Sequence, residues 1–199
     1  MADLSESLQA FVNYVKTHLK GDEKGDEKGE SADFLDHLFR ALGHDGIHAA
    51  GATRETRLAK KGGGKGKNFA DLMWPERVLI EMKSRGKKLH RHYDQLFDYW
   101  THIVPHRPPY VILCNFDEFW IYDFNIQLFD PVEKIALADL PSRAEALAFF
   151  LPKPRKPLFN NNRVDATRQA ADERRKPRMG TVNPAGSRSG IFHTPLALG

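Results

Sequence analysis

The sequence is poor in cysteine and has no long apolar run. Cys114 is the one cysteine among 199 residues, which excludes an internal disulfide and fits a reducing cytoplasm. It lies in the apolar run 110–114, which predicts a buried structural thiol rather than a nucleophile. No apolar stretch approaches about 18 residues, so we expect no membrane span. The first residues lack the basic and apolar segments of a secretory signal, so we expect a cytoplasmic protein.

A nucleotide-binding loop is also missing. The glycine-rich segment 60–67 has no Ser or Thr after its lysines and lacks the spacing of a phosphate-binding P-loop. Its composition predicts instead a mobile basic hairpin tip that contacts a DNA backbone without reading base sequence. The lysines at this tip that we select as DNA contacts are Lys61, Lys65 and Lys67.

Positive charge is concentrated in one part of the chain. The formal net charge is +4, yet residues 54–91 alone hold 12 Lys and Arg against 4 Asp and Glu. This region contains Arg85 and Lys87 as well as the hairpin tip. Such an excess favours binding of a polyanion such as double-stranded DNA. A solvated loop with no ligand is the alternative.

Hydrophobic periodicity predicts an α/β domain over residues 1–151, with a mixed central sheet and helices on its faces. From residue 152 the chain becomes basic and rich in proline, which predicts a linker followed by a disordered tail over 152–199. Helices are predicted at 8–19, 30–42, 87–102 and from Asp139, and strands at 47–60, 69–73, 77–83, 110–114, 118–124 and 132–137.

Residues 69–83 predict two strands joined by a turn at 74–76. Side chains alternate along a strand, so Glu81 and Lys83 share one face, and pairing of the strands can bring Asp71 near Glu81. Two carboxylates can hold Mg²⁺, and a nearby lysine can orient the attacking water or neutralise charge on a phosphate. The pattern therefore predicts a metal-dependent nuclease site. A surface ion pair at a strand end, with Asp71 in a loop, is the alternative.

Further polar residues lie on predicted helices. Gln95 and Tyr99 are four residues apart and so share a helix face, where they could support the site or only pack. His92 is two residues from His90, which disfavours a metal pair and predicts a histidine that faces solvent or DNA. Glu30 begins the second predicted helix and could reach the metal site from its first turn. Its charge could equally serve to stabilise the N-terminus of that helix.

These residues carry a resemblance to a known superfamily. The set Glu30, Asp71, Glu81-x-Lys83 and Gln95-x-x-x-Tyr99 resembles the PD-(D/E)XK nucleases, in the branch with a Gln-x-x-x-Tyr helix motif. More closely, about residues 8–160 are similar to the N-terminal domain of MmeI-like type IIL restriction-modification enzymes. The segments that carry this likeness are 11–15, 70–72, 78–83, 95–100 and 114–124.

The resemblance implies a restriction-endonuclease-like fold and a DNA endonuclease that uses Mg²⁺, with Mn²⁺ as a possible substitute. It implies that Asp71 and Glu81 are metal ligands and that Lys83 is the catalytic lysine. It further implies that Glu30 is a supporting carboxylate and that Gln95 and Tyr99 support the site or contact DNA.

In that family a helical spacer, an S-adenosylmethionine-dependent adenine methyltransferase and a target-recognition domain follow the nuclease. Residues 160–172 resemble the beginning of that spacer, which implies a remnant of it within 152–199. Segment 107–110 (Arg-Pro-Pro-Tyr) lacks the acceptor that a methyltransferase needs for the target amine, and no glycine-rich cofactor loop follows a strand. We therefore expect a truncated chain with no S-adenosylmethionine site and with a separate methyltransferase or specificity partner. A non-catalytic DNA-binding remnant and a structural module of a methyltransferase complex are the alternatives.

Overall fold

The computed structural model describes residues 3–21, 27–58, 68–103, 105 and 107–161. Its first two helices are α1 (Leu4–His18) and α2 (Glu27–Ala41). Both bury one apolar face, because their large apolar residues recur every three or four positions. The predicted hairpin tip at 60–67 and the tail from residue 162 lie outside the described residues.

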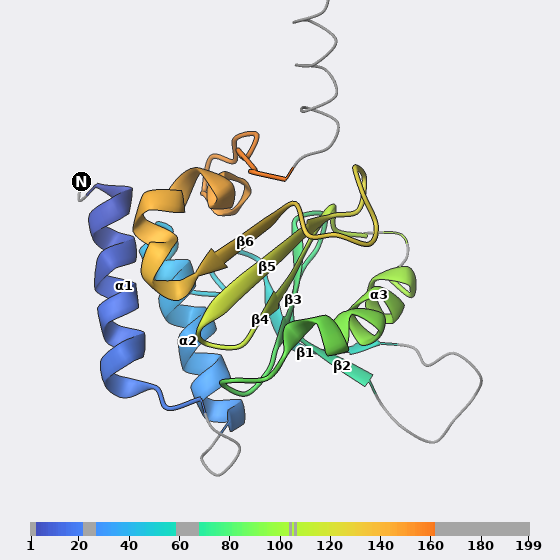
Figure 1. The fold of residues 1–199 in the computed structure, drawn as a ribbon, viewed down its shortest axis with the longest axis horizontal. Helices are drawn as coiled ribbons and strands as arrows, with labels where there is room; N and C mark the ends of the chain where they lie inside the picture. The colour runs from blue at the N-terminus through green and yellow to red at the C-terminus, as the bar shows by residue number, and fades with distance from the viewer. Residues whose placement is uncertain (1–2, 22–26, 59–67, 104, 106, 162–199) are drawn as a thin grey trace, which may run out of the picture.

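A mixed six-stranded sheet in the order β1-β2-β3-β4-β5-β6 forms the centre of the domain (Figure 1). Neighbouring strands are antiparallel except β3 and β4, which are parallel and are connected through η1 and α3. The strands are β1 (Thr53–Leu58), β2 (Asn68–Trp74), β3 (Val78–Met82), β4 (Tyr110–Cys114), β5 (Glu118–Asp123) and β6 (Glu133–Ala136).

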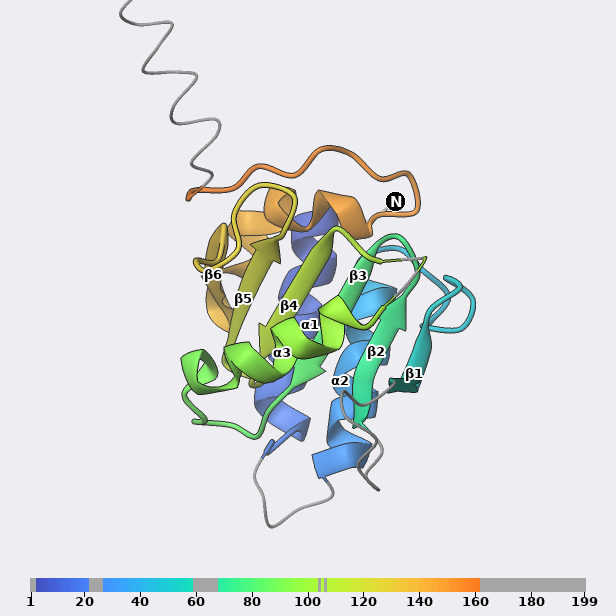
Figure 2. The ribbon, with the colours of Figure 1, turned by 90° about the vertical axis from the view of Figure 1, so that its right-hand side faces the viewer.

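Helices cover both faces of this sheet. Figure 2 shows α3 (Tyr93–Thr101) in front of the strands and α1 and α2 behind them. One buried apolar cluster joins the sheet to α1 and α2, and a second joins it to α3. Of the helices in the described residues, none is long and apolar enough to cross a membrane. The predicted α/β architecture is confirmed.

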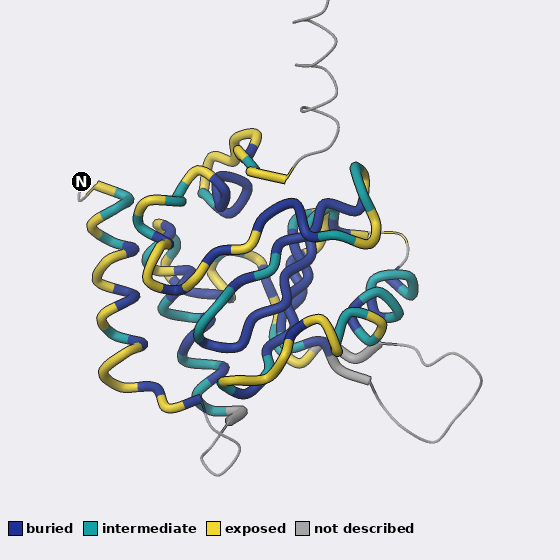
Figure 3. Tube along the Cα trace, in the orientation of Figure 1, coloured by how far each residue is buried: buried dark blue, intermediate teal, exposed yellow. Residues whose placement is uncertain are grey.

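The central strand β3 is buried along its whole length (Figure 3). Val78 and Ile80 pack into the cluster on the side of α1 and α2, whereas Leu79 packs into the cluster on the side of α3. A strand covered on both faces is expected to be apolar at consecutive positions. This burial includes Glu81, so the carboxylate enters a largely apolar environment.

Three predictions of element type or length were wrong. The strand predicted at 47–60 begins only at Thr53, because residues 47–51 form turns that end at Gly51 with φ 87°. The helix predicted at 87–102 is a 3₁₀ turn, η1 (Leu89–His92), followed by α3. The last helix is not an α-helix but the 3₁₀ segment η2 (Leu137–Phe150), which is interrupted at Arg143, where the backbone leaves helical geometry (φ −112°, ψ 20°).

Beyond η2 the chain stays against the domain as far as residue 161. The Arg155 amide donates to the Ala148 carbonyl at 3.1 Å, and the Asn161 amide donates to the Val132 carbonyl at 3.0 Å. The predicted linker is therefore held against η2 and against the segment before β6 as far as residue 161. The domain boundary at residue 151 stays a prediction.

Phe34 tests the core between the sheet and the first two helices. Its side chain is fully buried, and its ring lies 5.1–5.7 Å from those of Phe11, Phe116 and Phe119. Phe34→Ala should lower the free energy of urea unfolding by about 3–5 kcal/mol, because it leaves a cavity. Phe129→Ala, at a side chain that is 79% exposed, should change it by less than about 0.5 kcal/mol. Equal effects of the two substitutions would contradict this packing.

Candidate active site

β2 and β3 separate at one end of their shared ladder. The ladder runs from the pair Trp74–Val78 to the pair Leu72–Ile80. Beyond the pair Leu72–Ile80, the described residues of β2 pair with β1, and those of β3 pair with β4. Asp71 lies at the separation, where its Oδ2 accepts a hydrogen bond from the Met82 amide at 2.7 Å. The predicted approach of Asp71 to the strand that carries Glu81 is confirmed.

Glu81 is a buried carboxylate with one oxygen that lacks a donor. Its Oε1 accepts hydrogen bonds from Lys83 Nζ at 2.7 Å and from Gln95 Nε2 at 3.2 Å. Its Oε2 is buried and has no hydrogen-bond partner among the described residues. Burial, and then the charge of Asp71, raise the pKa of Glu81 to about 7, because both disfavour the ionised form.

Gln95 connects the carboxylate, the ammonium and a tyrosine. Its Oε1 accepts a hydrogen bond from Lys83 Nζ at 3.2 Å, and its Nε2 donates to Tyr99 Oη at 2.6 Å. One turn of α3 separates Gln95 from Tyr99, and Tyr99 also packs in the apolar cluster between α3 and the sheet. Lys83 is thus held by both Glu81 and Gln95, while Tyr99 both packs and bonds to Gln95.

A cavity of about 220 Å³ adjoins these groups, and we call it the catalytic cavity after the role that we propose for it below. α2 contributes three of its lining residues, and β1 contributes Arg54 and Glu55. A volume of this size is several times the share of one liquid water molecule, so it can hold a phosphate group with water. The full lining is Ser31, Ala32, Leu35, Arg54, Glu55, Asp71, Glu81, Met82 and Lys83.

The donor set fits a hard divalent cation. Mg²⁺ is commonly held by one or two carboxylates together with waters and substrate phosphate, and Asp71 and Glu81 are neighbouring carboxylates. The buried Glu81 Oε2 is an acceptor for which the described residues supply no donor. No cluster of three or more His, Cys, Asp or Glu residues suited to a metal occurs within the described part of the chain. A metal site here would therefore depend on this carboxylate pair.

The chain is similar to a known family of proteins. Residues 6–173 match the family model described as "MmeI, N-terminal domain". The chain belongs to the MmeI N-terminal domain family. The resemblance noted from the sequence is therefore confirmed at the level of the family. The matched region contains every strand of the sheet and the whole catalytic cavity.

One solved structure similar to this MmeI-family chain is described as "cryoEM structure DrdV-DNA complex". The likeness covers 85% of this chain at 15% sequence identity, with a TM-score of 0.46. The chain spans 15% of that longer chain. No curated protein matches the sequence.

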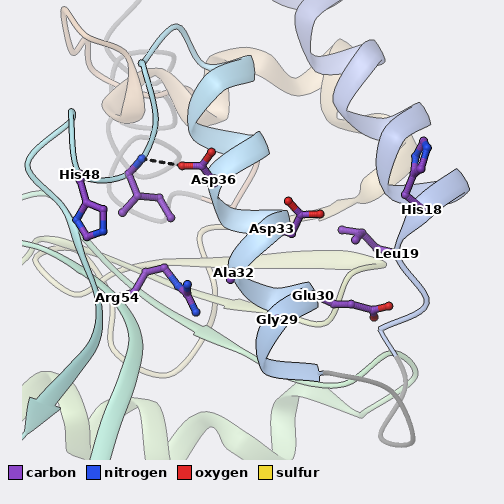
Figure 4. Close-up of a pocket in the computed structure, with 10 residues that line it drawn as sticks. His18, Leu19, Gly29, Glu30, Ala32, Asp33, Asp36, His48 and Arg54 are labelled. Carbon is purple, nitrogen blue, oxygen red and sulfur yellow. Dashed lines mark hydrogen bonds between the residues drawn. The ribbon is translucent and has the colours of Figure 1, made fainter.

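Glu30, the supporting carboxylate that the resemblance to the MmeI family implies, is not brought to the catalytic cavity. Its carboxylate accepts hydrogen bonds from the amides of Lys20 at 3.2 Å and Gly21 at 2.5 Å. Figure 4 shows Glu30 extending from α2 towards the end of α1, in a second cavity of about 650 Å³. The observed role of Glu30 is to hold the connection that follows α1.

The predicted DNA contacts of the MmeI domain lie in two segments, 61–67 and 85–87. Lys61, Lys65 and Lys67 lie outside the described residues. Lys87 is exposed and lines a cavity of about 440 Å³ together with Gly86, Lys88, Arg91 and His92. For these four lysines, contact with DNA stays a prediction.

Arg85, also predicted to contact DNA, is engaged within the protein. Its guanidinium forms an ion pair with Asp117 and donates to the carbonyls of Leu19 and Lys20. These contacts join the segment after β3 to the end of α1. A contact between Arg85 and DNA would have to coexist with them.

His92 is nearer to the site than the sequence indicates. Burial, and then the positive charges of Lys83 and Lys87, lower the pKa of this histidine. The sequence predicts a histidine that faces solvent or DNA, without a link to Lys83. The sequence does contain one signal for this position of His92. His92 precedes Gln95 by three residues, so the two residues lie on the same side of the chain near the start of α3.

Cys114 is the final residue of β4 and is fully buried. Burial raises the pKa of its thiol, because the thiolate would lose its hydration. A thiol in this state is a poor nucleophile, so the prediction of a structural cysteine is confirmed.

The raised pKa of Glu81 makes stability depend on pH. When the pKa of an acid rises on folding, the folded protein loses stability as the pH increases through the interval between the two pKa values. For Glu81 this interval runs from the ordinary pKa of 4.5 to about 7. Glu81→Gln removes this titration. With a chelator present, the variant should therefore gain stability relative to the unchanged protein between pH 5 and pH 8, on the order of 2–3 kcal/mol. Urea unfolding at the two pH values measures this difference.

The matched control for this titration is Glu6→Gln, at an exposed position of α1. Its stability relative to the unchanged protein should be the same at both pH values. If Glu81→Gln behaves like this control, the raised pKa of Glu81 is wrong.

Proposed function

We propose that this chain is the endonuclease domain of a restriction-modification system and hydrolyses phosphodiester bonds in double-stranded DNA with Mg²⁺. The observation that carries the proposal is that Asp71, Glu81 and Lys83 line one cavity, in which Glu81 Oε2 is buried and receives no donor from the described residues. Membership of the MmeI N-terminal domain family supports it. Mn²⁺ is the expected substitute for Mg²⁺.

Asp71 and Glu81 are the residues that would hold the metal. Asp71 is oriented by its bond to the Met82 amide, and Glu81 by Lys83 and Gln95. When bound, the metal polarises a phosphate oxygen and lowers the pKa of a coordinated water. Rigid carboxylates favour this chemistry because they need little rearrangement during the reaction.

Lys83 would act on the phosphate or on the attacking water. An ammonium has three donors, of which Glu81 Oε1 and Gln95 Oε1 each take one. The third can donate to a phosphate oxygen, where negative charge increases in the transition state. Gln95 is a positioning residue, since it fixes both Lys83 and Glu81.

The substrate class follows from charge. Residues 54–91 include Asp71, Glu81 and Lys83 of the catalytic cavity, and this part of the sequence carries the basic excess that binding of a DNA backbone requires. Sequence specificity needs contacts with base edges, whereas the polar groups of Glu81 and Lys83 in the catalytic cavity bond to each other. We therefore assign specificity to a methyltransferase or target-recognition partner.

Nicking of supercoiled DNA tests this function. The purified chain with Mg²⁺ or Mn²⁺ should convert supercoiled plasmid to the open circular form, and a chelator should stop the reaction. Lys83→Ala should lower the rate by at least about 10²-fold, because it removes a donor to developing charge. Lys16→Ala, at an exposed position of α1, should leave the rate unchanged.

Two outcomes would contradict the nuclease assignment. Retardation of DNA without metal-dependent cutting would favour a non-catalytic DNA-binding domain. Neither binding nor cutting would favour a structural module of a methyltransferase complex.

A further inference from the structure

Arg54 of β1 borders two cavities at once. It lines the catalytic cavity and also the second cavity, which contains Glu30. Its backbone pairs with Leu72 of β2, one residue from Asp71. Figure 4 shows its side chain reaching from β1 towards α2 near Ala32. The guanidinium is therefore placed at the wall of the proposed active site.

Within the described part of the chain, no acceptor is bonded to the buried Nε of Arg54. Its Nε is buried and has no hydrogen-bond partner, and the side chain forms no ion pair with any residue that the structure describes. Buried donors in folded proteins are nearly always paired, because the loss of hydration is otherwise not offset. A ligand that supplies oxygen acceptors would satisfy this side chain.

The carboxylates of the second cavity have other partners. Asp33 accepts a hydrogen bond from Tyr14 Oη at 2.5 Å. Asp36 accepts one from Arg40 Nε at 2.7 Å and another from a backbone amide at 3.1 Å. The acids that face Arg54 across this cavity therefore bond elsewhere, which leaves the guanidinium available for an external anion.

The backbone beside Arg54 is strained. Glu55 has φ 49°, in the left-handed region that residues other than glycine, asparagine and aspartate seldom adopt. The ladder between β1 and β2 pairs Arg54 and Thr56 but skips Glu55. Strain of this kind is concentrated at functional sites, and Glu55 lines the catalytic cavity.

We propose that Arg54 binds a backbone phosphate of the DNA strand that enters the catalytic cavity. A guanidinium matches two phosphate oxygens with parallel donors. The cavity also contains Glu55, Asp71 and Glu81, which repel a phosphate, and Lys83 is already paired with Glu81. Arg54 offsets this repulsion. The assignment rests on the proposed function, which supplies DNA as the ligand.

The salt dependence of DNA binding tests this assignment. A labelled DNA duplex is titrated with the full-length Lys83→Ala chain, which does not cut it, at several salt concentrations. Adding Arg54→Gln should weaken binding about tenfold and reduce the slope of log affinity against log salt by about one, because one phosphate contact is lost. Arg54→Lys should keep the slope but bind several-fold more weakly, since an ammonium makes no bidentate contact.

Lys16→Gln is the matched control, because it removes one positive charge from an exposed position of α1. It should change neither affinity nor slope. Unchanged affinity and slope in Arg54→Gln, with a normal thermal unfolding midpoint, would overturn the assignment. If Arg54→Gln does not fold, Arg54→Lys decides: unchanged affinity in that variant overturns the assignment.

Nicking by the chain with Lys83 intact separates the two proposals. Normal nicking together with binding that does not depend on Arg54 refutes the Arg54 assignment alone. Binding that depends on Arg54, without any nicking, refutes the nuclease function alone. Absence of nicking by the intact chain, together with absence of duplex binding by the Lys83→Ala chain, refutes both.

Discussion

The hydrogen bond from the Met82 amide to Asp71 is the contact on which the site depends. Two antiparallel strands that separate leave backbone donors and acceptors without partners, and such groups need replacements when they are buried. Asp71 provides one replacement, since its carboxylate takes the place of a carbonyl on the neighbouring strand. The same contact holds this carboxylate next to Glu81, so one side chain serves both the fold and the site.

Burial of the Glu81 carboxylate beside the carboxylate of Asp71 is unfavourable for the fold alone. The hydration that the Glu81 carboxylate loses on burial is only partly replaced, because Lys83 and Gln95 both donate to the same oxygen, Oε1. A domain selected only for stability would fill this position with an apolar residue, as it does at Leu79 and Ile80. The retained charge is therefore better explained by a cation and a phosphate than by the stability of the sheet.

Much of this arrangement could be predicted from the sequence because it depends on local periodicity. Alternation along one strand places Glu81 and Lys83 together, and the turn, predicted at 74–76 and observed at 75–77, sets the register that brings Asp71 to them. The spacing of Gln95 and Tyr99 predicts their shared face on α3, although only the packing of α3 on the sheet shows that Gln95 reaches Lys83.

The remaining features depend on contacts between segments far apart in the chain. Arg54 lies on a strand with a weak sequence signal, and its importance comes from the cavity between β1 and α2. Glu30 was predicted from its place at a helix start, but the connection after α1 supplies amides that take its carboxylate. The 3₁₀ geometry of η1 and η2 could not be predicted either, since apolar periodicity alone favours an α-helix.

Metal binding observed by nuclear magnetic resonance is the most direct test of the carboxylate pair. If Asp71 and Glu81 hold the metal, substoichiometric Mn²⁺ will broaden the amide signals of Asp71, Glu81 and Met82 first, and Asp71→Asn will abolish this broadening. Broadening centred on Asp33 and Asp36 in the second cavity, or broadening that Asp71→Asn leaves intact, would contradict a metal site between the separated strands.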